Sequence, residues 1–182
     1  VEFAGMPLAI VVAATRDQAL RAAAAVTADI ARLEPVLTIE RALELGQNVV
    51  PPQVIRRGDA SAAIARAPRK LSAQLFAGGQ EHFYLEGQIA AALPLEDGVH
   101  VYSSTQHPSE IQHKLAHAFH LPMSAVRVEV RRMGGGFGGK ESQGNALAIA
   151  CAIGARLTGR PCKMRYDRDD DMMITGKRHD LR

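Results

Sequence analysis

The order of apolar and polar residues predicts a helix-rich beginning to the chain. An unbroken apolar run over 7–14 is typical of a strand buried on both faces. Thr15 follows as a helix N-cap, with a capping-box glutamine three places on, and the alanine-rich stretch beyond it predicts a helix to about Val26. Thr38 predicts the cap of a short helix that ends at Gly46. We therefore expect a β-α-β unit with a trailing helix.

From Gln47 the periodicity fades into a proline-rich connection, which we expect to run over a surface and to contain a short helix over 60–67. Alternation of apolar and polar residues then begins at Leu71 and predicts strands. The dipeptide Asp97-Gly98 lies between two such runs, which is a strong signal for a β-hairpin.

A helical pattern follows over 108–121, with Ile111, Leu115, Ala118 and Phe119 on one face. Beyond it the pattern predicts a strand, a helix that is apolar on nearly all sides and so must be buried, and a last strand. These three elements span 125–133, 143–159 and 162–167.

Composition narrows the class of protein. Of 182 residues, 47% are hydrophobic and 23% are charged, which is typical of a globular domain. The net charge of +3 without a long basic run argues against nucleic acid as a partner, and no apolar stretch is long enough for a membrane helix. Cys151 and Cys162 form neither a disulfide framework nor a closed zinc site, so a cytoplasmic setting is expected. With no initiator Met and few aromatic residues, the chain is expected to be a fragment.

The stretch RRMGGGFGGKESQ contains five glycines among the six residues from Gly134 to Gly139. A phosphate-binding P-loop needs a hydroxyl after its lysine, but Glu141 follows Lys140 here. A dinucleotide-binding turn needs a near-continuously apolar leading strand, and the strand before these glycines alternates with charges. Both readings are therefore disfavoured.

So many glycines raise the entropic cost of ordering this segment. That cost implies that a ligand approaches the main chain closely and accepts hydrogen bonds from its amide groups. We expect the segment to bind an anionic or oxo-bearing group.

A second glycine pair precedes Gln80 in the stretch GGQEHFYLEG, residues 78–87. Strand alternation predicts that Gln80, His82 and Tyr84 share one face. An ordinary β-bulge with a surface glutamine is the alternative.

Two further groups of polar residues could hold a metal ion. His113 and His117 are four apart on the predicted helix, near His120, but no carboxylate or cysteine completes a ligand set. The acidic stretch 167–172 resembles the start of an EF-hand but lacks its glycine, so a solvated, capped turn is expected.

The stretches GGQEHFYLE, RMGGGFGGKES and YDRDDDMMITGKRH closely resemble the molybdenum-binding domain of the xanthine dehydrogenases, within the xanthine oxidase family of molybdenum hydroxylases. The opening FAGMPLAIVVAATRDQALRAA resembles the α/β-hammerhead domain that precedes it. The resemblance implies an α+β fold with mixed sheets, in which 1–50 complete a hammerhead domain, 51–70 form a linker and 71–182 begin the molybdenum cofactor-binding domain.

The resemblance also implies roles for single residues. Gln80 would hydrogen-bond an oxo ligand of molybdenum, and Phe137 and Gly138 would line the metal, with no protein atom bound to it directly. Glu141 would contact a purine substrate, where aldehyde-oxidising relatives usually carry an apolar residue. The remaining cofactor-binding residues implied are Gly79, Gly136 and Gly139.

The implied activity is hydroxylation of hypoxanthine and xanthine to urate, with a molybdenum–molybdopterin cofactor whose form, plain or cytosine dinucleotide, is left open. Iron–sulfur clusters and FAD would lie on partner subunits or segments and pass electrons to NAD, in a dimer of heterodimers. The fragment alone is expected to be inactive. The alternatives are another N-heterocycle or an aldehyde as substrate, a nucleotide-binding module, and a structural or assembly module.

Overall fold

The computed structural model describes residues 1–3 and 5–181, which form two compact units. One unit contains Val1–Ala25 together with Leu75–Arg182, and the other contains Val26–Gln74. None of the helices in the described residues is long and apolar enough to cross a membrane.

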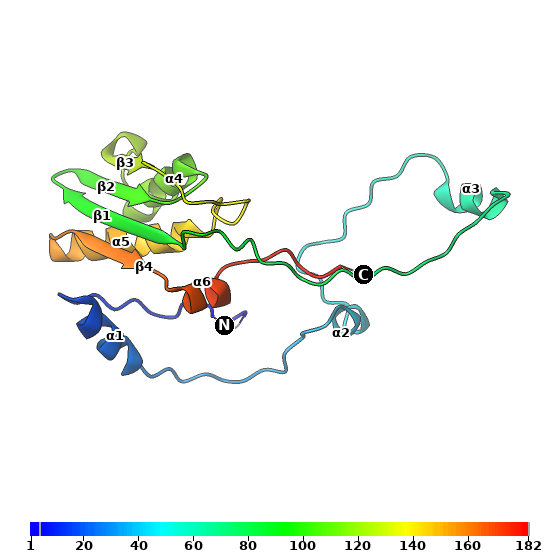
Figure 1. Ribbon diagram of the computed structural model, residues 1–182, viewed down its shortest axis with the longest axis horizontal. Coiled ribbons are helices and arrows are strands. Elements are labelled where there is room, and N and C mark those ends of the chain that lie inside the picture. The colour runs from blue at the N-terminus through cyan, green and yellow to red at the C-terminus, as the bar shows by residue number, and fades with distance from the viewer. Residues whose placement is uncertain (4, 182) are drawn as a thin grey trace. The chain divides into compact units, whose positions relative to one another are not determined.

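The first unit is built on a four-stranded mixed sheet in the order β3-β2-β1-β4 (Figure 1). Its strands are β1 (Ile89–Leu95), β2 (Gly98–Ser103), β3 (Val126–Glu129) and β4 (Cys162–Arg165). β1 is antiparallel to both β2 and β4, whereas β2 and β3 are parallel. The sequence-based prediction of an α+β fold with a mixed sheet, including the hairpin, is confirmed.

Two helices pack on one face of this sheet and against each other: α4 (Pro108–Phe119) and α5 (Gly144–Thr158). As predicted, α5 is buried along most of its length, because small residues let it lie close to β1. The buried hydrophobic side chains between sheet and helices form the core; they include Ala92, Val99, Val101, Ile111, Leu115, Val126, Leu147, Ala148 and Ala152.

The apolar face of α4 differs in one residue from the prediction. Ile111 and Leu115 are fully buried and Phe119 is partly buried, but Ala118 is exposed and Ala116 is buried in its place. The helix contacts β3 as well as α5, and this second contact turns the buried stripe toward Ala116.

The predicted strand over 7–14 is wrong, and with it the β-α-β unit. No strand pairs with this segment in the described part of the chain, and a strand needs hydrogen-bonded neighbours. The segment is extended and largely exposed, although the space beside Gly154 on α5 is filled in part by Val12. The helix that follows, α1 (Arg16–Ala24), is confirmed with its predicted cap, because Thr15 accepts a hydrogen bond from the Gln18 amide.

The second unit contains two short helices. α2 (Ile39–Glu44) begins after its predicted cap Thr38, and α3 (Ala60–Arg66) is capped by Asp59. Neither helix contributes a buried residue. The position of α2 was predictable because its cap is a local signal that needs no tertiary partner. α3 forms within the short helix predicted over 60–67, but its Asp59 cap was not predicted.

In the hairpin between β1 and β2, Gly98 is needed because the backbone near Ala125 lies very close to it. Leu95 pairs with Gly98, so the turn itself consists of Glu96 and Asp97. A Cβ atom at Gly98 would lie 1.9 Å from the carbonyl oxygen of Ala125, at the end of the short 3₁₀ helix η1 (Met123–Ala125). The start of β2 therefore passes too close to the chain entering β3 for any side chain.

We expect Gly98→Ala to destabilise the fold by roughly 1–3 kcal/mol, because the added methyl group meets backbone that must shift. Gly78→Ala is the matched control, since a Cβ there would have open space around it. Chemical denaturation of both variants measures the difference. Equal stability of the two variants would contradict the close approach of β2 and Ala125.

Burial of Cys151 against the sheet raises the pKa of its thiol to about 12. At pH 8 only about one thiol in ten thousand would then be ionised, and the thiolate is the reactive form. We expect Cys151 in a Cys162→Ala background to resist iodoacetamide at pH 8 until the protein is unfolded. Mass spectrometry of alkylated peptides measures this, and rapid alkylation in the folded state would refute the burial of the thiol.

Candidate functional site

The segment Gly134–Gly139, which we call the glycine loop, lies against the residues that follow the first glycine pair. A Cβ atom at Gly139 would lie 2.6 Å from Cε1 of Tyr84 and 2.7 Å from Cγ of His82. Only glycine allows this approach, so the two glycine motifs of the sequence meet in space. His82 and Tyr84 both lie beside the loop, but the strand predicted over 78–87 does not form, since β1 begins only at Ile89.

Glu86 holds the start of the glycine loop. Its Oε2 atom accepts hydrogen bonds from the Gly134 amide at 2.8 Å, from the Ser104 hydroxyl at 2.7 Å and from the Lys140 ammonium at 3.2 Å. Partial burial acts to raise the pKa of Glu86, but these three donors outweigh it and lower the pKa below its ordinary value. The carboxylate is therefore held in its charged form.

Two glutamines hold the other end of the loop. Oε1 of Gln106 accepts from the amides of Gly138 at 3.0 Å and Lys140 at 3.2 Å. Gln88, which is fully buried, donates from Nε2 to the carbonyl oxygen of Gly139 at 2.9 Å. The loop is thus fixed at both ends by side chains from the β1 and β2 region.

Three consecutive amides at the middle of the loop have no hydrogen-bond partner among the described residues: those of Gly135, Gly136 and Phe137. Phe137 has a φ of +53°, which is uncommon for a residue with a side chain, and the residue is 75% exposed. A row of free N–H groups suits a ligand that presents oxo or phosphate oxygens.

Lys140 does not face the ligand side of this loop. Its side chain is fully buried, with Nζ 2.9 Å from the Ser104 hydroxyl and 4.8 Å from the centre of the Tyr84 ring. Burial lowers the pKa of Lys140, and Glu86 acts against that effect. The lysine of a P-loop reaches its nucleotide's phosphates, so this orientation agrees with the rejection of a P-loop.

A buried carboxylate binds two of the residues that contact the glycine loop, Tyr84 and Gln88. Asp171, on α6 (Arg168–Ile174), accepts from the Tyr84 hydroxyl and from the Gln88 amide, each at 2.7 Å. Burial raises the pKa of Tyr84, so its hydroxyl stays protonated as a donor. The solvated turn predicted for 167–172 is therefore only partly right: Asp167 does cap a helix, but Asp171 is buried.

Gln80 and Gly79 lie at an isolated bridge rather than against the glycine loop. Gln80 exchanges backbone hydrogen bonds of 2.9 and 3.0 Å with Arg178, and its side chain is exposed. A Cβ atom at Gly79 would lie 3.3 Å from the carbonyl oxygen of Arg178. Between this bridge and Tyr84, Phe83 has a φ of +50°, so the regular strand predicted here is interrupted. No hydrogen bond joins Gln80 to the glycine loop within the described residues.

Glu141 is exposed directly after the fixed end of the loop, three residues before α5. It makes no hydrogen bond or ion pair in the part of the chain described. Its carboxylate is therefore available to a ligand on the exposed side of the loop.

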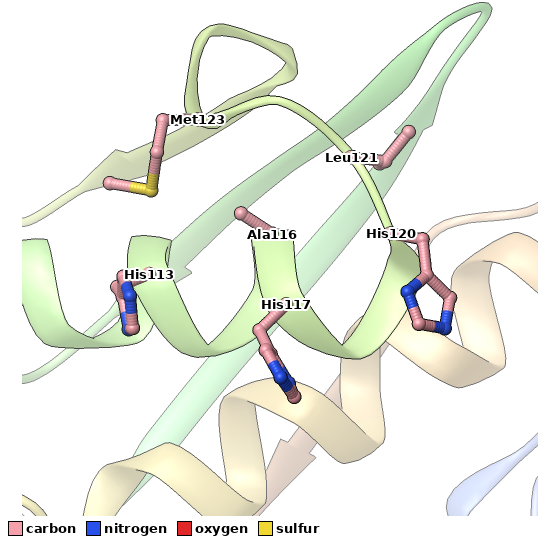
Figure 2. A pocket seen from close by; sticks show the side chains of 6 residues that line it. All are labelled: His113, Ala116, His117, His120, Leu121 and Met123. Carbon is pink, nitrogen blue, oxygen red and sulfur yellow. The ribbon is translucent and has the colours of Figure 1, made fainter.

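The histidines of α4 line a separate, open hollow of about 340 Å³ (Figure 2). His113 and His117 project from successive turns of the helix, and His120 lies at its end in a left-handed conformation. Nowhere in the described residues do three or more histidine, cysteine or acidic side chains form a group that could hold a metal ion. As in the sequence, no third ligand stands beside His113 and His117 among the described residues.

Several residues that fix the glycine loop were not predicted from the sequence: Glu86, Gln88, Ser104, Gln106, Lys140 and Asp171. One of them left a usable signal. Gln88, Ala90 and Ala92 alternate along the chain, so the pattern predicts all three on the buried face of the sheet. A glutamine on that face needs hydrogen-bond partners inside the protein.

The contacts of Glu86 imply that the free energy of unfolding depends on pH in the acidic range. The pKa of this carboxylate is lowered in the folded state, so its contribution is present above the unfolded value of about 4.3 and is lost as pH falls through the folded value. We expect the free energy of unfolding to fall more steeply below pH 4.3 in the wild-type chain than in Glu86→Gln. Denaturant titrations from pH 6 to pH 3 measure it, and parallel curves would contradict the assignment.

Comparisons with known proteins agree with this geometry. Residues 43–182 match the family model of the molybdopterin cofactor-binding domain. The chain is 42% identical over 178 residues to xanthine dehydrogenase of Drosophila pseudoobscura, a match that covers 96% of the chain and 13% of that relative. It is 38% identical over 180 residues to aldehyde oxidase 2 of Cavia porcellus, covering 97% of the chain and 14% of that relative.

The fold also matches solved structures. Quinoline 2-oxidoreductase from Pseudomonas putida superimposes with a TM-score of 0.74 at 24% identity, over 87% of this chain and 21% of that one. The aldehyde oxidoreductase from Desulfovibrio desulfuricans gives 0.68 at 20% identity, over 90% of this chain and 19% of that one. The chain therefore belongs to the molybdopterin cofactor-binding domain family, as a molybdenum-binding segment of the xanthine oxidase family.

Proposed function

We propose that this chain is part of the molybdenum-binding subunit of a xanthine dehydrogenase and that the glycine loop holds the molybdenum–pterin cofactor. The observation that carries the proposal is the row of unpartnered amides at Gly135, Gly136 and Phe137, on a loop fixed at both ends. These donors fit a group that presents oxo or phosphate oxygens. The missing Cβ atoms let the loop pack tightly on its own supports, since a Cβ atom at Gly136 would lie 2.6 Å from Oε1 of Gln106 and one at Gly139 would lie 2.6 Å from Tyr84.

In this assignment the residues of this chain bind the cofactor and orient it. The middle amides donate hydrogen bonds to the cofactor, whereas the amides of Gly138 and Gly139 already bond to Gln106 and Gly136. Gly138 supplies clearance, because a Cβ atom there would have only His82 near it, at 4.0 Å. Gly139 lies beside it and packs on His82 and Tyr84. Gln80, from the bridge with Arg178, presents its exposed side-chain amide to the cofactor. When bound, the cofactor would supply a two-electron oxidation in which a ring C–H and water give C–OH, two protons and two electrons, and the electrons would leave to the partner's redox groups.

Glu141 is the proposed substrate contact. Its exposed carboxylate can accept a hydrogen bond from a purine N–H and stabilise charge that develops on the ring. The similarity to a xanthine dehydrogenase at 42% identity supports a purine substrate. A second candidate is an aldehyde or another N-heterocycle, which the similarity to aldehyde oxidase 2 at 38% identity favours.

The segment that matches this chain makes up only 13% of the xanthine dehydrogenase and 14% of the aldehyde oxidase 2. We therefore propose that residues 1–50 complete a hammerhead domain, 51–70 link it to the cofactor domain, and 71–182 begin that domain. Iron–sulfur clusters and FAD on a partner subunit or segment would take the electrons to NAD, in a cytoplasmic dimer of heterodimers.

The test is xanthine-dependent urate formation by the complete, molybdenum-loaded enzyme. We expect Glu141→Val to lower kcat/KM for xanthine by about 10- to 100-fold, the effect of losing a hydrogen bond to a charged group. Glu96→Gln, in the exposed β1–β2 turn, is the control for loss of a surface carboxylate. A loaded wild-type enzyme that forms no urate but oxidises aldehydes would replace the xanthine assignment with the second candidate.

A further inference from the structure

Lys140 carries a fully buried charge in the first unit. It is 0% exposed, although an ammonium group strongly prefers water. An apolar side chain of similar length would fill the same space without a desolvation penalty. The retained charge therefore indicates a specific geometric task.

The contacts of Lys140 identify that task. Through its backbone, Lys140 belongs to the end of the glycine loop: its carbonyl oxygen accepts from the Gln106 amide at 2.8 Å and from the Thr105 hydroxyl at 3.0 Å. Through its side chain it reaches Oε2 of Glu86, the same atom that accepts the Gly134 amide at the start of the loop. One residue thus connects both ends of a six-residue loop.

The charge of Lys140 is not available to a ligand of the glycine loop. Glu86 neutralises the ammonium at 3.2 Å, and Ser104 and the Tyr84 ring occupy its remaining sides. The loop therefore offers a ligand oriented amide dipoles instead of a free cation. This arrangement fits uncharged oxo groups as well as anions.

We propose that Lys140 is a positioning residue: acting through Glu86, it joins the two ends of the glycine loop and so holds the amides of Gly135, Gly136 and Phe137 in their binding orientation. The importance of those amides rests on the proposed function, but the joining of the loop ends does not. Lys140 itself contacts neither cofactor nor substrate in this assignment.

The experiment measures hydrogen exchange in the complete enzyme prepared without cofactor. In Lys140→Met we expect exchange in peptides covering 131–143 to rise about tenfold, because the charged partner of Glu86 is lost, while peptides from α5 are unchanged. Glu86→Gln should have a similar effect. Lys163→Met, which removes an exposed lysine from β4, should have none.

The double variant Lys140→Met/Glu86→Gln separates positioning from general stability. If Lys140 acts through Glu86, the double variant should exchange no faster than the stronger single variant. Additive effects, or unchanged loop exchange in both single variants, would overturn the proposal. Should Lys140→Met fail to fold, Glu86→Gln alone still decides, since unchanged exchange there also overturns it.

Molybdenum retained after dialysis of the loaded enzyme is the second readout. We expect Lys140→Met to retain at least several-fold less molybdenum than Lys163→Met. Faster loop exchange with full retention would support the role of Lys140 in the loop and refute the glycine loop as the cofactor site.

Discussion

The three hydrogen bonds that meet at one carboxylate oxygen of Glu86 are the constraint on which the candidate site depends. The acceptor draws a loop amide, a hydroxyl from the end of β2 and a buried ammonium to one point. Two of the donors come from the two ends of the loop, whereas Glu86 and Ser104 lie beside β1 and β2, so the loop is fixed only where the sheet brings that carboxylate and that hydroxyl together. The site is in this sense a product of the fold and not of the loop sequence alone.

The same constraint explains why a glycine-rich segment can be ordered. Five glycines carry a high conformational entropy, and contacts at both ends of the loop offset it without using the middle amides. The clearances at Gly139 let the loop lie directly on His82 and Tyr84. Rigidity and free hydrogen-bond donors are thereby obtained in one short segment.

Local signals in the sequence were sufficient for much of the fold. Caps such as Thr15 and Thr38, the hairpin turn and the all-round apolar helix α5 were predictable because each is decided by residues close in sequence. The run over 7–14 misled because apolar composition cannot show whether a pairing partner exists. Lys140 and Asp171 could not be predicted as buried, since each needs partners more than 30 residues away.

The left-handed backbone of Phe137 has a consequence for engineering the protein. A side chain at such a φ costs of order 1–3 kcal/mol, and glycine would remove that cost. A thermostability screen that rewards only folded protein would therefore favour glycine at this position. It would also discard the exposed ring that the loop presents beside its free amides, so selection for stability alone would drift away from the binding surface.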